Sequence, residues 1–276
     1  LQERLKICSE AVEMIVTINK EKIFVATGGQ VFDNSKPTVV LVHGSGLDHR
    51  CWALQARWFA FHGYSVFAPD LPGHSLSEGK PLGSIEAMGK WLVDALDSAG
   101  ATSIHLVGHS MGFLIALEAA NLLEGRLKTL TAIASAESIP VNEDLVTTAK
   151  SSAAAAADLM LKWGFGSTAQ LGVSAVPGMQ PIAIGRQVMS DNPLAIDLKA
   201  CQAYTRGGDM VQNIRCPSHV ILATEDRMTP CKFGLELADH LKAKVSQIDN
   251  SGHMLPLESP KKTLDAAKSF IGKHTN

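Results

Sequence analysis

Residues 104–120 read IHLVGHSMGFLIALEAA: an apolar β-branched run, a serine flanked by Gly-His and Met-Gly, and a run rich in Ala and Leu. The first run predicts a strand over Ile104–Val107, and the last predicts a helix over 111–124 that is stopped by Gly125. So short a turn between strand and helix forces Ser110 into a strained backbone conformation, and the flanking glycines leave room for it. We therefore expect an exposed Ser110 hydroxyl at the carboxyl edge of a sheet.

The rest of the chain alternates strand signals with helix signals on both sides of this turn. Helical stretches are expected around residues 51–62, after an N-cap at Ser84, and from about Pro260 to Gly272. Strands joined by helices of this length predict an α/β fold with a mostly parallel, doubly wound sheet, because such strands are apolar throughout. The other predicted strands are Val39–Val42, Tyr64–Ala68, Leu130–Ala134, His219–Ala223 and Lys244–Ile248. Thr229-Pro230 and Ser259-Pro260 each resemble an N-cap followed by proline at the first helical position.

The rhythm changes over residues 138–213, where strand runs vanish and Ala, Met and Leu dominate. We expect three or four helices there, broken at 164–166, 177–178 and 192–193. The segment is therefore predicted to be a helical cap inserted into a core domain formed by residues 14–137 and 214–276. Residues 1–13 precede Met14 as an N-terminal extension, to which we assign no role.

Composition narrows the classes of function. Apolar residues make up 46% of the 276 residues and charged residues 19%, enough for a packed core in one large domain. A net charge of −2, without a basic stripe, argues against nucleic acid as a partner. No apolar run could cross a bilayer and no secretory signal opens the chain, so we expect a cytoplasmic protein without a membrane partner. The five cysteines match no zinc spacing, and reduced, mostly buried thiols are expected.

A serine hydroxyl needs a base that takes its proton, and the base needs an acid that orients it. His253 follows the last predicted strand, and Asp226 follows the His219–Ala223 strand, so both can reach the edge that carries Ser110. Glu225 is the rival acid, either as the true partner or as a solvated surface group. Ser110 could instead be only the N-cap of its helix.

Other histidines are expected elsewhere: His62, His105 and His219 in the core or on the surface, and His109 turned away from the pocket.

Acyl transfer also needs donors aimed at the oxygen that becomes negative. The N–H of Met111 is one candidate. The second is the N–H of Ser45, in the Gly-rich turn that follows the Val39–Val42 strand. The alternative is an ordinary Gly-rich turn with His43 as a packing residue.

These residues together resemble the α/β-hydrolase superfamily, in its branch that carries a helical cap between the sixth and seventh strands. The resemblance covers about residues 15–271 and rests on VHGSG with Trp52 downstream, APDLPGHSLS, GHSMG, ATEDRMTP and GHMLPLESP. It implies that Ser110, Asp226 and His253 are catalytic and that the Ser45 N–H helps to hold the oxyanion.

Some positions depart from the family pattern. Phe113 stands where a second glycine is common, and Gly73-His74-Ser75 replaces Gly-His-Gly. Relatives that cleave halides or epoxides use an Asp nucleophile, which Ser110 argues against. Relatives that cleave carbon–carbon bonds often have Asn beside the nucleophile and Trp after the final His, where this chain has His109 and Met254.

The resulting hypothesis is a serine hydrolase that cleaves carboxylic esters through an acyl-enzyme, with no cofactor and no metal. Its expected partner is a small ester-like substrate of largely apolar character. The oligomeric state is left open. Two alternatives stay open: a lactonase, thioesterase or perhydrolase that uses the same triad, and a ligand receptor built on a hydrolase scaffold.

Overall fold

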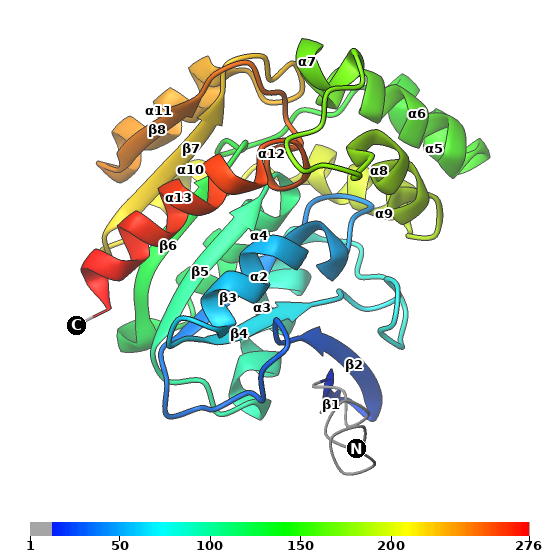
Figure 1. The fold of residues 1–276 in the computed structure, drawn as a ribbon. Coiled ribbons are helices and arrows are strands. Elements are labelled where there is room, and N and C mark those ends of the chain that lie inside the picture. The colour runs from blue at the N-terminus through cyan, green and yellow to red at the C-terminus, as the bar shows by residue number, and fades with distance from the viewer. Residues whose placement is uncertain (1–12, 276) are drawn as a thin grey trace, which may run out of the picture.

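The computed structural model describes residues 13–275, which form one eight-stranded sheet with helices on both faces (Figure 1). The strands follow the spatial order β1-β2-β4-β3-β5-β6-β7-β8. All neighbours from β4 to β8 pair in parallel, and β1 and β2 pair antiparallel. The predicted fold class is confirmed. The strands are β1 (Glu13–Ile18), β2 (Glu21–Ala26), β3 (Thr38–Val42), β4 (Ser65–Pro69), β5 (Ile104–His109), β6 (Leu127–Ile133), β7 (Ser218–Ala223) and β8 (Lys244–Ile248).

The β1–β2 hairpin is a pair of strands that the sequence analysis did not assign. Its two-residue turn, Asn19 and Lys20, has positive φ angles of 52° and 72°. Two positive φ values are what a tight hairpin turn requires, but Asn-Lys is a weaker signal than Asn-Gly. β2 continues the sheet by pairing Val25 and Ala26 with the end of β4.

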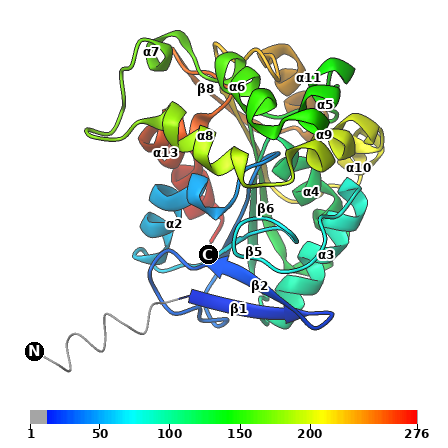
Figure 2. The ribbon, with the colours of Figure 1, turned by 90° about the vertical axis from the view of Figure 1, so that its right-hand side faces the viewer.

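Two layers of helices cover the sheet (Figure 2): α2 and α13 lie on one face, and α3, α4 and α11 lie on the other. Ser84 caps α3 as predicted, since its hydroxyl oxygen accepts the Ala87 N–H. The helices of these layers are α2 (Ala53–Ala60), α3 (Ile85–Ser98), α4 (Met111–Ala120), α11 (Cys231–Leu241), α12 (Leu255–Glu258) and α13 (Pro260–Ile271). Short 3₁₀ turns occur at η1 (His49–Trp52), η2 (Glu124–Arg126) and η3 (Gly272–His274).

The prediction for Thr229-Pro230 is wrong. Helix α11 begins one residue later, with Pro230 itself as the N-cap, and the Thr229 hydroxyl hydrogen-bonds Asp226 instead. α13 does begin at Pro260, but Ser259 makes no capping bond because its hydroxyl pairs with that of Ser251.

The segment between β6 and β7 holds six helices, more than the three or four expected. Relative to four expected helices, the two additional divisions fall at residues 204–206 and at Ser152, whose extended backbone divides one Ala-rich run into two helices and whose side chain accepts the Ala155 N–H. The helices are α5 (Glu143–Ser151), α6 (Ala153–Gly164), α7 (Ser167–Gln170), α8 (Pro181–Ser190), α9 (Leu194–Ala203) and α10 (Gly207–Gln212). The division into a core domain and a cap at 138–213 stays a prediction.

No role was predicted for the N-terminal extension, residues 1–13. Of these residues the structure describes only Glu13, which begins β1. Four cysteines lie in the described part, all with free thiols: Cys51 and Cys201 are buried, and Cys216 and Cys231 are partly exposed. Across residues 13–275 we find no helix with the length and apolar content needed to cross a bilayer.

Candidate active site

Ser110 is the single residue between the end of β5 and the start of α4, as the sequence predicts. Its backbone lies at φ 54° and ψ −124°, a conformation that L-residues rarely adopt. The strain is held by two hydrogen bonds: the Ser110 N–H donates to the Ile133 carbonyl at 3.0 Å, and the Ser135 hydroxyl donates to the Ser110 carbonyl at 3.0 Å. The Ser110 side chain makes no capping hydrogen bond to α4. The structure therefore gives no support to a capping role.

The glycines of this turn are required by close packing. A Cβ on Gly108 would collide with the backbone of Gly112 and Phe113, and a Cβ on Gly112 would collide with the carbonyl groups of Val42 and His43. Because these obstacles are backbone atoms, no side-chain rotation can relieve them. The first turn of α4 can thus lie directly against the end of β3.

We expect the Gly112→Ala substitution to lower the free energy of unfolding by about 3 kcal/mol, the upper end of the usual cost of overpacking. Gly83→Ala is the matched control, since a Cβ at Gly83 would have no neighbouring atom within 4 Å. It should change stability by less than about 0.5 kcal/mol. Urea unfolding followed by circular dichroism measures both. Equal stability of the two variants would contradict the packing described for the turn.

His253 and Asp226 form a buried pair. His253 Nδ1 lies 2.9 Å from Asp226 Oδ2, and both side chains are at most 2% exposed. The other carboxylate oxygen, Oδ1, accepts the N–H groups of Met228 and Thr229, each at 2.8 Å. Burial alone would raise the pKa of Asp226, but the His253 ring and the Thr229 donors lower it below its usual value. An ionised carboxylate accepts a proton from Nδ1, and the His253 tautomer that carries its proton there has the Nε2 lone pair of a base.

Ser110 and His253 line the same cavity, which has a volume of about 200 Å³. Ser45 also lines it, and most of its remaining wall is apolar. No hydrogen bond between the Ser110 hydroxyl and His253 occurs among the described residues. The rest of the wall comprises Ile139, Pro140, Val141, Asn142, Leu145, Met160, Trp163, Leu198, Cys201, Arg227 and Met228. A larger hollow of about 380 Å³ between α2 and α13 contains none of the three residues, so we place the candidate site at the smaller one.

The chain has relatives among known proteins. Residues 39–266 match the family model described as the alpha/beta hydrolase family. The chain belongs to the alpha/beta hydrolase family. The predicted resemblance is confirmed, and so is the prediction that the chain is an α/β-hydrolase enzyme.

Relatives of this alpha/beta hydrolase include esterases and lactonases. The pimeloyl-[acyl-carrier protein] methyl ester esterase of Methylococcus capsulatus is 26% identical over 265 residues, covering 90% of this chain and 98% of the relative. The 3-oxoadipate enol-lactonase 1 of Acinetobacter baylyi is 23% identical over 241 residues, covering 85% and 88%. Among solved structures, a thermophilic esterase from Thermogutta terrifontis superimposes with a TM-score of 0.80 at 20% identity, covering 96% of this chain and 99% of that one.

The two candidate oxyanion donors lie near Ser110 in this alpha/beta hydrolase. Met111 begins α4, where the first N–H groups of a helix have no intrahelical acceptor. The turn that carries Ser45 lies against the nucleophile, since a Cβ on Gly44 would be 3.2 Å from Ser110 Cβ. Among the described residues, neither the Ser45 N–H nor the Met111 N–H donates a hydrogen bond. Both N–H groups therefore lack a hydrogen-bond acceptor within the described part of the chain, and we propose below that they bind the oxyanion.

Glu225, the rival acid, does not face His253. Its carboxylate accepts the Ser167 N–H at 2.6 Å and the Ser167 hydroxyl at 3.0 Å, at the start of α7. These two donors lower the pKa of Glu225. Glu225 is thus bound to the segment between β6 and β7.

Glu258 is a buried acid that the sequence analysis missed. It accepts the Gly166 N–H at 3.0 Å and the Gly252 N–H at 2.9 Å, so it ties the loop that carries His253 to the end of α6. Burial raises its pKa. A glutamate after a GHMLPL run carries no sequence signal for this role, because both partners are distant backbone groups.

His62, His105, His109 and His219, the histidines expected outside the cavity, do lie outside it. His109 is buried outside the cavity, and its Nε2 donates to the His253 carbonyl at 2.8 Å. Burial lowers the pKa of His109 to about 3, so the ring is neutral and braces the His253 loop without charge. His105 pairs with Thr129 and His219 with Ser246, while His62 stacks on Trp58 at the surface. Phe113, which replaces the family's glycine, is buried in the core between α4 and its neighbours and does not line the cavity.

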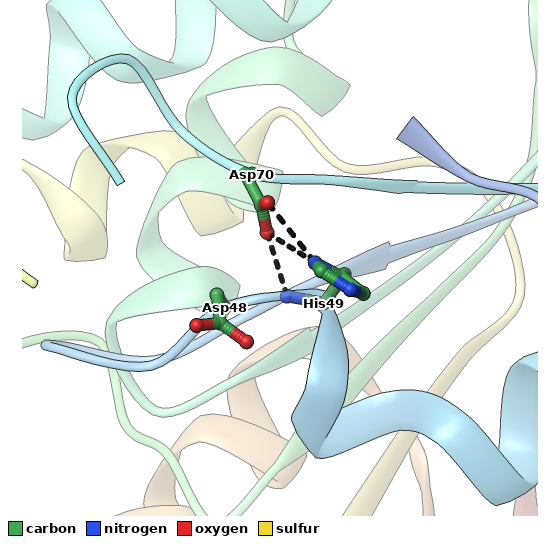
Figure 3. A group of neighbouring side chains, drawn as sticks. All are labelled: Asp48, His49 and Asp70. Carbon is green, nitrogen blue, oxygen red and sulfur yellow. Dashed lines mark hydrogen bonds and ion pairs between the residues drawn. The ribbon is translucent and has the colours of Figure 1, made fainter. Parts of the chain in front are cut away.

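One group of three side chains has the donor atoms of a metal site: Asp48, His49 and Asp70 (Figure 3). These potential metal ligands already make hydrogen bonds and ion pairs within the protein. Asp48 binds the Arg50 guanidinium through both carboxylate oxygens, with a shortest distance of 2.6 Å. Asp70 accepts the His49 N–H and contacts the His49 ring, both at 2.8 Å. With an Arg cation already paired to Asp48, we assign this group to holding the loop after β3 and not to a metal.

Proposed function

We propose that the protein is a serine hydrolase that cleaves carboxylic esters through an acyl-enzyme. The observation that carries the proposal is the strained Ser110 in one cavity with His253, whose other ring nitrogen is held by the buried Asp226. A merely structural serine would need neither the strained turn nor an oriented imidazole in the same cavity.

In the proposed reaction, Ser110 Oγ attacks the ester carbonyl carbon while His253 Nε2 takes the hydroxyl proton. The carbonyl oxygen becomes negative and accepts the N–H groups of Ser45 and Met111. When the tetrahedral intermediate collapses, the carbon–oxygen bond to the alcohol breaks and the alcohol leaves with the proton from His253. Water then repeats the sequence on the acyl-enzyme and releases the acid. Asp226 stays ionised and stabilises the imidazolium that forms.

The proposal is tested with an activated phenyl ester, with and without a serine-directed phosphonate. We expect steady turnover of the ester. The phosphonate should abolish this turnover in proportion to the fraction of the protein that it labels. A protein that binds the ester without releasing phenol would be a ligand receptor on the same scaffold, and turnover that survives full labelling would exclude Ser110 as the nucleophile.

The wall of the cavity supports an uncharged acyl group of modest size. Its side chains from the predicted cap are largely apolar, among them Leu145, Met160 and Leu198. Of the large cap residues in the sequence, Met160 and Trp163 line the cavity, while Leu161, Phe165 and Met189 are buried in packing. We propose that the cap selects the acyl group through these few positions and that its other apolar residues only hold it together.

Enlarging Met160 should shift the acyl-length preference. In Met160→Trp the cavity loses volume, so we expect kcat/KM for hexanoyl relative to acetyl esters to fall by about 10-fold or more. Leu159→Trp is the control, because Leu159 is the neighbouring residue on α6 and does not line the cavity. A series of p-nitrophenyl esters measures both profiles. If both variants lost only thermal stability, the cap would have no part in selecting the substrate.

Lactone hydrolysis by the same residues is the second candidate. It is favoured by the enol-lactonase relative and by Arg227, a cation in the cavity wall that belongs to no ion pair of the described residues. Hydrolysis of a γ-lactone that bears a carboxylate, faster than of the same lactone without it, would support this reaction over simple esters.

A further inference from the structure

The turn that carries Ser45 is held by the segment between β6 and β7 and not only by its own strand. Within the turn, the Leu47 N–H donates to the Gly44 carbonyl at 3.1 Å, and Gly46 takes a positive φ of 66°. Ser45 and Gly46 are therefore the two central residues of a β-turn, and the turn itself makes no use of the Ser45 N–H. What fixes the direction of that N–H is the anchoring of the peptides beside it.

Helix α9 supplies one anchor. The Gly46 N–H donates to Asp197 Oδ2 at 2.7 Å, and Asp197 is fully buried. Just before α9, Asn192 supplies the other anchor: its side-chain amide donates to the carbonyls of Gly46 and Leu47, both at 3.1 Å. The peptide groups on both sides of Gly46 are thus bound by residues 146 or more positions away in the sequence.

Asp197 has a buried counter-charge. His74 Nε2 lies 3.0 Å from Asp197 Oδ2, and His74 Nδ1 lies 3.2 Å from the Pro72 carbonyl. Both ring nitrogens face acceptors, an arrangement in which the doubly protonated imidazolium donates two hydrogen bonds. Burial opposes this charge, but Asp197 raises the pKa of His74, helped by Asp70. With His74 protonated, the charge of the Asp197 carboxylate is balanced, and the anchor places no uncompensated negative charge beside the oxyanion site.

We propose that Asp197, paired with His74, is a positioning residue that orients the Gly44–Leu47 turn so that the Ser45 N–H meets the oxyanion. The inference rests on the proposed ester hydrolysis and adds to it that the oxyanion site is complete only when α9 is seated. Without the carboxylate, the buried Gly46 N–H has no acceptor and the turn relaxes. That loss affects the transition state more than substrate binding, because the donor matters most when charge develops on the oxygen.

The test compares Asp197→Ala with Asp197→Asn, which keeps an acceptor for the Gly46 N–H. We expect Asp197→Ala to lower kcat by about 10²-fold, the lower end of the cost of losing one oxyanion donor, with KM little changed. Asp197→Asn should retain more of kcat than Asp197→Ala. Affinity for a trifluoromethyl ketone, which adds to the serine and leaves an oxyanion in the same place, should fall in parallel with kcat.

Tyr204→Phe is the matched control, since the Tyr204 hydroxyl, at the end of α9, donates a buried hydrogen bond to Glu118 at 2.9 Å. It should lower the urea midpoint and leave kcat unchanged. If Asp197→Ala stays folded with kcat within about twofold of wild type, or if Tyr204→Phe loses as much kcat, the positioning role is wrong. If Asp197→Ala does not fold, Asp197→Leu takes its place, since leucine fills a similar volume without an acceptor for the Gly46 N–H; the same loss in kcat is expected, and an unchanged kcat again overturns the inference. A wild-type protein that hydrolyses no ester would instead refute the proposed function.

Discussion

Replacing Ser110 with alanine is expected to abolish ester hydrolysis, with kcat falling by about 10⁶-fold, as when the nucleophile of a serine triad is removed. The fold should remain, because the substitution removes only a hydroxyl that makes no capping bond and relieves none of the backbone contacts of the turn. The measurement is turnover of an activated phenyl ester beside a thermal melt of each variant.

A second substitution, His253→Ala, tests whether Ser110 and His253 act together. Triad residues act as a unit, so Ser110→Ala combined with His253→Ala should lose little more activity than either change alone. Losses that multiply in the double variant would mean that the two residues act in separate steps, and the assigned pair would be wrong.

Asp226→Asn is expected to lower kcat by up to about 10⁴-fold. The reason lies in the hydrogen bonds of the carboxylate. Because the N–H groups of Met228 and Thr229 both donate to Oδ1, an asparagine must keep its oxygen there and place its NH₂ group beside His253 Nδ1. Nδ1 would then accept, the ring proton would move to Nε2, and the base would lose the lone pair that it needs for Ser110.

Glu225→Gln is the control for this prediction. Glu225 binds Ser167 and not His253, so the kcat of the Glu225→Gln variant should stay within about twofold of wild type. A reversal, with Glu225→Gln inactive and Asp226→Asn active, would mean that the acid is assigned to the wrong residue.

The parts that could be predicted from the sequence are those with a local signal. A few neighbouring residues are enough to predict the GHSMG turn, the Ser84 cap and the strands. Ser110, Asp226 and His253 could be proposed because each follows a predicted strand. The prediction of Thr229 as a cap failed because the Thr229 hydroxyl donates a hydrogen bond to Asp226 at 2.7 Å and does not cap the helix. The β1–β2 hairpin was missed because its turn lacks glycine.

The supporting contacts could not be predicted because their partners are far apart in the chain. His74 and Asp197 are separated by 123 residues, and no pattern around either one identifies the other. Glu258 and His109 act on backbone groups, which leave no mark on the sequence at all. The sequence thus predicts the candidate reacting groups, whereas the contacts that position them depend on tertiary packing.

The central claim is that Ser110 becomes acylated during turnover. Mass spectrometry of acid-quenched enzyme after mixing with an activated phenyl ester tests it most directly. We expect one acyl group per chain, on the peptide that contains Ser110, and none on the Ser110→Ala variant. An acyl group on another residue, or steady hydrolysis by Ser110→Ala at the wild-type rate, would contradict the account.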